Sequence, residues 1–136
     1  MIAWTEDLFT GNSIIDEEHK QLIELLNAIR VASSGRKRRA FRKDMVEKML
    51  ILTKNHFATE QKLMLQYRYE MAVHHTGEHE KMLLAFEGLI VNYDEHGSEG
   101  IANFFENWLA NHLFSEDMQM ARWIQFHQCL GLIPPQ

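Results

Sequence analysis

The sequence predicts an all-α protein, an up-down-up-down antiparallel four-helix bundle with an N-terminal arm and a short C-terminal helical extension. Three observations support this prediction. Apolar residues recur every three or four positions, which is the spacing of one helix face. The only two prolines are Pro134 and Pro135, so no proline interrupts helices earlier in the chain. Strand-like alternation of apolar and polar residues is absent over any useful length.

The expected elements follow one another with short connections, which favours antiparallel neighbours in a single domain. Trp4 and Phe9 belong to the arm. Gly35 is placed to end the first helix as a C-terminal cap, and the segment from Gly97 to Gly100 forms a turn before the fourth helix. In chain order, the elements of this domain (residues 1–136) are an arm at 1–14, helices at about 16–34, 38–66, 71–94 and 100–116, and a C-terminal segment at 117–136.

Composition sets the broad class of the protein. With 136 residues, 46% of them hydrophobic and 24% charged, the chain is typical of one globular domain. The net charge of −5 argues against a nucleic-acid partner, and the basic run from Arg36 to Arg39 is interpreted as a solvated turn. No stretch reaches the roughly 20 apolar residues of a membrane helix, and the start of the chain lacks a signal-peptide pattern. A cytoplasmic location without membrane association is therefore expected, and the single cysteine, Cys129, excludes an internal disulfide.

Polar residues occupy positions where the helices are expected to build an apolar core. His56 and Glu60 are four residues apart on the second helix, and His75 and His79 are four apart on the third. A buried polar group without a partner is costly, so two such pairs in one core layer are best explained by a metal centre. The expected core stripes are Phe41, Met45, Met49, Leu52, His56, Glu60, Leu63 and Tyr67, followed by Met71, His75, His79, Met82, Phe86, Leu89 and Tyr93.

The first and fourth helices add three candidate ligands, which are His19, His112 and Asp117. A single histidine on an apolar face is more often a hydrogen-bonded core residue than a ligand, and this interpretation applies to His19 taken alone. It fails for His56 with Glu60 and for His75 with His79, because both pairs must be satisfied in the same core layer. Seven donors exceed the four ligands of a tetrahedral zinc site and fit two metals roughly 3.5–4 Å apart. Five imidazoles, two bridging carboxylates and a bridging hydroxide would leave one coordination position open for a small ligand. The remaining histidines are expected at the surface: His74, His96 and His127.

The same residues match a known family. The matching pieces appear in family order and span nearly the whole chain: Trp4, Ile15–His19, His56–Glu60, His75 with His79, Trp108–His112, and Asp117. On these pieces the sequence resembles the hemerythrins, in particular the single-domain bacterial form called bacteriohemerythrin. All seven ligand positions of that family are filled here.

The resemblance implies a non-haem di-iron centre that binds O₂ reversibly. By the family pattern, one iron would be held by His75, His79 and His112, the other by His19 and His56, and both would be bridged by Glu60 and Asp117. An oxo or hydroxo group would be the third bridge, and the vacant position of the two-histidine iron would receive O₂. By the same resemblance Leu109 would line the oxygen pocket, with Phe57 and Trp108 as further lining.

The chain departs from the family pattern at a few positions, none of which removes a ligand. Glu18 stands where many relatives have Gln, and Gln61 stands where many have a second Glu. Arg68 and Glu70 replace a common Gly and Pro in the turn after the second helix. Such replacements affect the groups around the ligands, which tune affinity and redox behaviour.

The expected function is oxygen storage, delivery to an oxygen-consuming enzyme, or buffering, by a monomer that is not itself an enzyme. Two alternatives stay open. A di-iron protein could scavenge NO or peroxide, although helix-bundle sites that activate O₂ are usually rich in carboxylates with two Glu-x-x-His motifs, and this one is rich in histidine. A sensor of O₂ or NO that acts through a partner protein is the other alternative.

Overall fold

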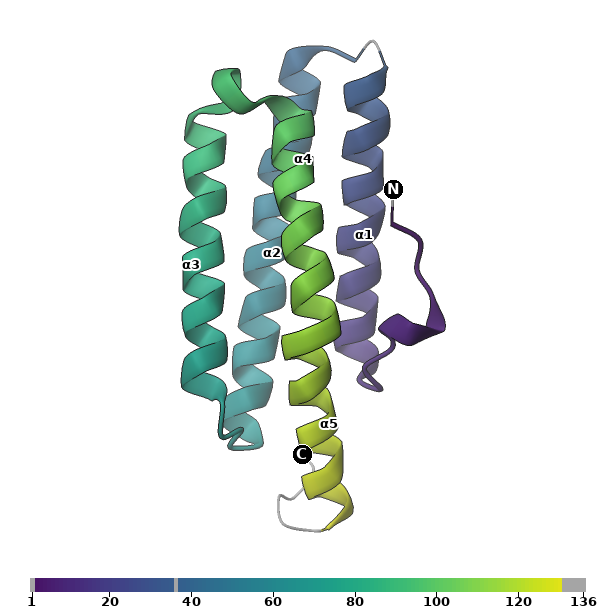
Figure 1. Cartoon of the computed structure of the whole chain (residues 1–136), viewed down its shortest axis with the longest axis vertical. Coiled ribbons are helices and arrows are strands. Elements are labelled where there is room, and N and C mark those ends of the chain that lie inside the picture. The colour runs from purple at the N-terminus through teal and green to yellow at the C-terminus, as the bar shows by residue number, and fades with distance from the viewer. Residues whose placement is uncertain (1, 36, 131–136) are drawn as a thin grey trace.

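The computed structural model describes residues 2–35 and 37–130, which form an antiparallel four-helix bundle (Figure 1). The predicted all-α fold class is confirmed, and no strand occurs in the described ranges. In chain order, the elements are a 3-10 turn at Glu6–Leu8, α1 at Ser13–Ser34, α2 at Arg39–Gln66, α3 at Ala72–Val91, α4 at Tyr93–Asn111, a π-helical turn at His112–Asp117, and α5 at Met118–Cys129. None of these helices is long and apolar enough to cross a lipid bilayer.

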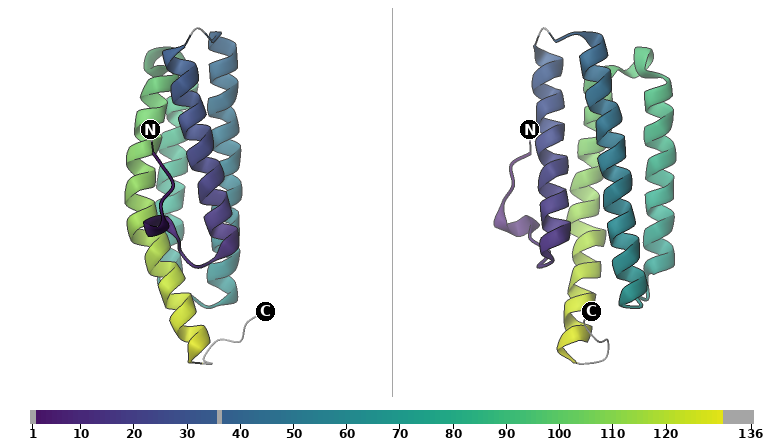
Figure 2. Two further views of the ribbon diagram at one scale, coloured as in Figure 1. Left: turned by 90° about the vertical axis from the view of Figure 1, so that its right-hand side faces the viewer. Right: turned by 180° about the vertical axis from the view of Figure 1, so that it is seen from behind.

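The N-terminal arm lies alongside α1, as the two views in Figure 2 show. The backbone of Ile2 exchanges two hydrogen bonds with the side-chain amide of Asn27, at 3.1 and 2.7 Å. Trp4 and Phe9 pack edge to face. At the start of α1, the Asn12 side chain accepts hydrogen bonds from two backbone N–H groups, which caps the helix.

The chain reverses between α3 and α4 at Asn92, so α3 ends slightly before the predicted residue 94. One helical turn then leads to Gly97, whose φ of 69° and ψ of 169° suit glycine alone. The helix resumes directly after this kink, so residues 98–100 are already helical. Glycine at position 97 permits this break in the helix, because a residue with a side chain rarely adopts this backbone conformation. At the same end of the bundle, Arg39 of the basic run pairs with Asp94.

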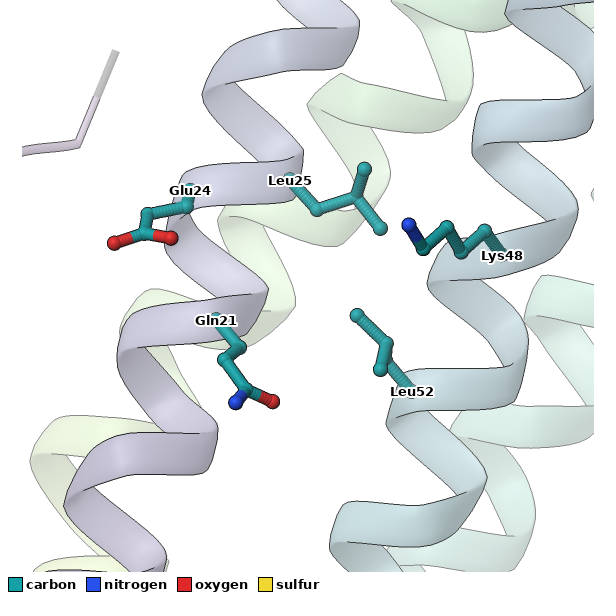
Figure 3. A pocket seen from close by; sticks show the side chains of 5 residues that line it. All are labelled: Gln21, Glu24, Leu25, Lys48 and Leu52. Atoms are coloured by element: carbon teal, nitrogen blue, oxygen red, sulfur yellow. The ribbon is translucent and has the colours of Figure 1, made fainter.

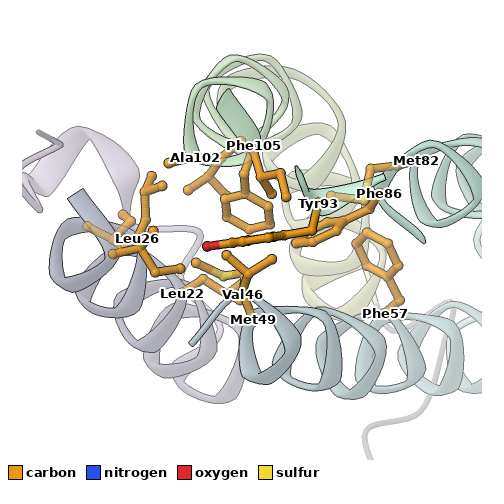
Figure 4. Close-up of a cluster of buried hydrophobic side chains, with 14 of the residues drawn as sticks. Leu22, Leu26, Val46, Met49, Phe57, Met82, Phe86, Tyr93, Ala102 and Phe105 are labelled. Atoms are coloured by element: carbon orange, nitrogen blue, oxygen red, sulfur yellow. The ribbon is translucent and has the colours of Figure 1, made fainter. Parts of the chain in front are cut away.

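The buried apolar side chains form two clusters with a polar layer between them. The larger cluster joins all four bundle helices (Figure 4) and the smaller one joins the ends of α1, α2 and α5. The members of the larger cluster include Leu22, Leu26, Val46, Met49, Met82, Phe86, Phe105 and Leu109, and those of the smaller are Ile15, Met64, Tyr67, Tyr69, Met120 and Ile124. Along α1 and α2, and from α4 into α5, the predicted ligands fall between members of these two clusters.

Two residues predicted for the core are exposed. Phe41 lies in the first turn of α2, is 49% exposed, and has the Lys37 ammonium over its ring. Met71 is 40% exposed because it precedes α3 and belongs to the turn. Helical spacing predicts a shared face only while the helix continues, so both errors fall at helix ends.

Candidate metal centre

The structure brings all seven predicted ligands together in one buried layer. Their side chains come from α1, α2, α3 and the π-helical turn that follows α4, and none is more than 3% exposed. Two groups of potential ligand atoms can be distinguished by their mutual distances. One contains Glu60, His75, His79, His112 and Asp117, and the other contains His19, His56 and Asp117.

The backbone explains how each pair of ligands meets. His56 and Glu60 lie one helical turn apart on α2, as do His75 and His79 on α3. His112 and Asp117 are five residues apart, and a regular α-helix would separate them by about 140° around its axis. The π-helical turn widens the helix locally and brings both side chains to the same layer.

Asp117 contacts histidines of both groups through different oxygens. Its Oδ2 lies 2.7 Å from Nε2 of His19 and 3.5 Å from Nε2 of His56. Its Oδ1 lies 2.6 Å from Nε2 of His112 and 3.2 Å from Nε2 of His75. This carboxylate therefore spans the two sets of imidazoles.

Glu60 spans them as well. Its Oε1 lies 2.9 Å from Nε2 of His56, 3.3 Å from that of His112 and 3.4 Å from that of His79. Its Oε2 lies 3.3 Å from Nε2 of His75. In all five histidines, Nε2 is thus the ring nitrogen that faces the carboxylates.

The donor set fits a pair of metal ions. Among residues 2–35 and 37–130, several of these atoms lie close to one another, but no partner with hydrogen-bond geometry is found for Oε2 of Glu60, Oδ1 of Asp117, or Nε2 of His75 and His79. More than nine in ten buried polar groups in native proteins make a hydrogen bond, so a cluster of exceptions requires a cause. Cations between these lone pairs would satisfy all four atoms. Imidazole and carboxylate donors suit iron, zinc, copper and manganese.

The carboxylates control the protonation of three histidines when no metal is present. Burial lowers the pKa of His75, but contacts with Asp117 and Glu60 outweigh burial and raise it to about 9. Burial also lowers the pKa values of His56 and His112, but neighbouring carboxylates outweigh burial and raise both values well above the usual range. Protons on these rings therefore balance the buried negative charge, and metal ions would replace them.

The pKa values of His79, Glu60 and Asp117 are lowered instead. Burial lowers the pKa of His79, and the positive charges of His112 and His75 add to this effect. Burial raises the pKa of Glu60, but the charged imidazoles outweigh it and hold this pKa well below its usual range. The pKa of Asp117 is also lowered, against burial and the Glu60 charge, chiefly by His112. Both carboxylates are therefore ionised and available as ligands at neutral pH.

Comparison with known proteins agrees with this geometry. The family model described as the hemerythrin HHE cation binding domain matches residues 10–124, a span that contains all seven predicted ligands. The chain belongs to the hemerythrin family. It is similar to the bacteriohemerythrin of Stenotrophomonas maltophilia (strain R551-3), with 29% identity over 93% of this chain and 84% of the relative. It is also similar to the bacteriohemerythrin of Pseudomonas paraeruginosa (strain DSM 24068 / PA7), with 28% identity over 85% and 76%.

Two acidic residues outside the ligand set contact the outward ring nitrogens of this hemerythrin centre. Oε1 of Glu18 lies 2.8 Å from Nδ1 of His56, and Oε2 of Glu18 accepts a hydrogen bond from the Thr59 hydroxyl. Oε2 of Glu116 lies 3.4 Å from Nδ1 of His112. Sequence reasoning singled out Glu18 only as a departure from the family and overlooked Glu116, although its four-residue spacing from His112 is a recognisable signal.

The aromatic residues predicted for the oxygen pocket stack on ligands of the hemerythrin centre. The Phe57 ring lies parallel to His79, with centroids 3.7 Å apart, and Trp108 stacks on His112 at 4.4 Å. Leu109 is fully buried in the larger apolar cluster. Phe57 and Trp108 thus cover imidazoles of the three-histidine group, and their contact with O₂ stays a prediction.

A depression of about 440 Å³ lies on the outer side of α1 and α2 (Figure 3). Its lining consists of Gln21, Glu24, Leu25, Lys48 and Leu52. No metal ligand of the hemerythrin centre lines this depression, and two of its five side chains carry a charge.

Proposed function

We propose that this hemerythrin binds O₂ reversibly at a di-iron centre held by the seven buried residues. The observation that carries the proposal is the pair of buried carboxylates, Glu60 and Asp117, each of which contacts imidazoles of both groups. When bound, the two iron ions would supply the electrons and the vacant coordination position that reversible O₂ binding requires. Iron is proposed because of the family, since imidazoles also bind zinc and copper.

The asymmetry of the histidines supports a single position for O₂. Three imidazoles face one side of the carboxylates, from His75, His79 and His112, and two face the other, from His19 and His56. If both metal ions share the bridging groups equally, the ion on the two-histidine side has one protein ligand fewer than the other ion. We infer that O₂ binds on that side.

The protein around the centre keeps water away from it. The larger apolar cluster lies on one side of the polar layer and the smaller cluster on the other. Phe57 and Trp108 cover two imidazoles with their ring faces. Burial in apolar surroundings limits solvent access, and solvent access together with the dielectric sets the redox potential of a metal site. Restricted solvent access of this kind supports the proposal of ligand binding at the centre.

The test uses protein loaded with ferrous iron under anaerobic conditions. Metal analysis is expected to give two iron ions per chain. Exposure to O₂ should produce a visible charge-transfer band that disappears on deoxygenation and returns over repeated cycles. Irreversible conversion to the ferric form on first exposure would refute reversible carriage.

The physiological role follows from reversibility. We propose storage, buffering or delivery of O₂ to an oxygen-consuming enzyme, by a monomer that does not itself catalyse a reaction. Sustained turnover of NO or peroxide would favour a scavenging enzyme instead. A partner protein captured by only the oxygenated or only the deoxygenated form would favour a sensor. Light scattering of the iron-loaded protein tests whether it is a monomer.

A further inference from the structure

Glu18 lies outside the ligand set but joins two helices beside the metal centre. Its side chain extends from α1 to α2 and is 24% exposed. Oε1 contacts Nδ1 of His56 at 2.8 Å, and Oε2 accepts a hydrogen bond from the Thr59 hydroxyl, whose oxygen lies 2.8 Å away. Both carboxylate oxygens are therefore engaged by residues of α2, which restricts where the carboxylate can move.

The contact distinguishes His56 from three of the other predicted ligands, which are His19, His79 and His112. In the part of the chain that the structure describes, Nδ1 of His19 and Nδ1 of His79 have no hydrogen-bond partner. Nδ1 of His112 faces Glu116, but at 3.4 Å this contact is longer than a good hydrogen bond. The short contact with a carboxylate thus falls on the two-histidine side, where O₂ is proposed to bind.

A carboxylate at Nδ1 has two physical effects on an imidazole ligand. It accepts a hydrogen bond from Nδ1–H, so the lone pair is left on Nε2, which here lies 2.9 Å from Glu60 and 3.5 Å from Asp117. It also makes Nε2 a stronger electron donor toward a metal. A neutral amide in the same place could provide the orientation but much less of the electron donation.

We propose that Glu18 is a positioning residue, which holds His56 as the Nδ1–H tautomer with Nε2 aimed at the metal and makes the two-histidine ion easier to oxidise. This inference rests on the proposed di-iron function. Orientation of the His56 ring and electron donation by its Nε2 are two separate effects, and different substitutions test them. Glu18→Leu removes both the hydrogen bond and the charge, while Glu18→Gln keeps a hydrogen-bond acceptor and removes the charge.

The first experiment titrates zinc into the metal-free protein, so it is independent of O₂ and of iron redox chemistry. The natural chain is expected to bind two ions. Glu18→Leu should bind the second ion about 10–100-fold more weakly, the usual range for loss of such an outer contact. Glu18→Gln should stay close to the natural chain. The adjacent Glu17→Gln is the matched control, because Glu17 is exposed and its loss changes the net charge equally.

Two further measurements separate positioning from simple loss of folding. In the zinc-loaded natural chain, ¹⁵N NMR should show a proton on Nδ1 of His56, and Thr59→Val should broaden or shift that signal while the helix content stays unchanged. In the iron-loaded protein, Glu18→Gln should oxidise more slowly in air than the natural chain or Glu17→Gln. Equal zinc affinities for Glu18→Leu and the natural chain, or equal oxidation rates for Glu18→Gln and Glu17→Gln, would overturn the inference. A natural chain that binds only one ion would overturn the proposed function itself.

Discussion

His112 and Asp117 are five residues apart in the chain, yet Nε2 of the histidine lies 2.6 Å from Oδ1 of the aspartate. The π-helical turn that joins α4 to α5 brings them together. Such turns are rare in helices and occur often at functional sites. Here the irregular turn positions a ligand of the three-histidine group beside a carboxylate that spans both groups.

Loss of the Asp117 charge is expected to affect both metal ions. In Asp117→Asn, the side chain keeps its size, but an amide nitrogen replaces one of the oxygens that face His19 and His112. Because each oxygen faces a different group of histidines, iron content should fall from two ions to none or nearly none.

A substitution on one side of the carboxylates should act differently. His79→Ala should first weaken binding of the ion on the three-histidine side. Elemental analysis after anaerobic loading measures both, with the exposed Glu99→Gln as control. Two bound irons in Asp117→Asn would contradict the bridging role.

Two neighbouring histidines offer a matched comparison. His75 is 2% exposed and contacts both carboxylates, whereas His74 is exposed on the outer side of α3. His75→Ala should lose iron and the oxygen-dependent band, since it removes a ligand. His74→Ala should keep both and change the free energy of unfolding by no more than about 0.5 kcal/mol. Similar iron content in the two variants would argue against the ligand assignment.

The metal-free protein should lose stability as the pH rises above neutrality. Since the pKa of His75 is about 9 in the folded chain and 6.5 is its ordinary value, its contribution to stability is complete below pH 6.5 and disappears by about pH 9. The pKa values of His56 and His112 are also raised in the folded chain, so their contributions to stability are lost in the same direction as the pH rises. The lowered pKa of His79 opposes them only near pH 6.5 and below. The loss from His75 alone is at most on the order of 3 kcal/mol.

Denaturant unfolding of the metal-free protein between pH 6.5 and 9 measures this loss. The zinc-loaded protein provides the contrast, because protons compete with the metal for the same nitrogens and its stability should rise over the same range. His74→Gln should follow the natural chain. A metal-free protein with the same unfolding free energy at pH 6.5 and pH 9 would show that the imidazoles do not carry the compensating charge.

Leu109 is expected to protect the centre from water. It is fully buried in the larger apolar cluster, three residues before the ligand His112. Leu109→Ala should lower the free energy of unfolding by about 2–5 kcal/mol through the cavity it leaves. It should also speed irreversible oxidation of the oxygenated protein, because water gains access to the site. Leu84→Ala, at a position 73% exposed, is the control. An oxidation rate equal to that of the control would exclude Leu109 from the oxygen pocket.

Much of the site could be predicted from spacing because its ligands come in short-range pairs. His56 with Glu60, and His75 with His79, lie one turn apart on continuous helices, so helical periodicity alone places each pair on one face. The same reasoning failed for Phe41 and Met71, which are exposed at helix ends. Periodicity carries no information on where a helix frays or on how far the neighbouring helix extends to cover it.

The sequence by itself predicted the helical bundle and placed His56 with Glu60 and His75 with His79 on shared helix faces, since both predictions depend on regular spacing within single helices. The other three predicted ligands, His19, His112 and Asp117, were supported by the resemblance to the hemerythrins. Only the tertiary structure decided that Glu18 of one helix meets His56 of another, and that His112 and Asp117 align through a π-helical turn. Contacts between helices depend on their relative rotation and displacement, which packing of the whole core determines. A one-residue change in that register would leave the sequence pattern intact and move these contacts apart.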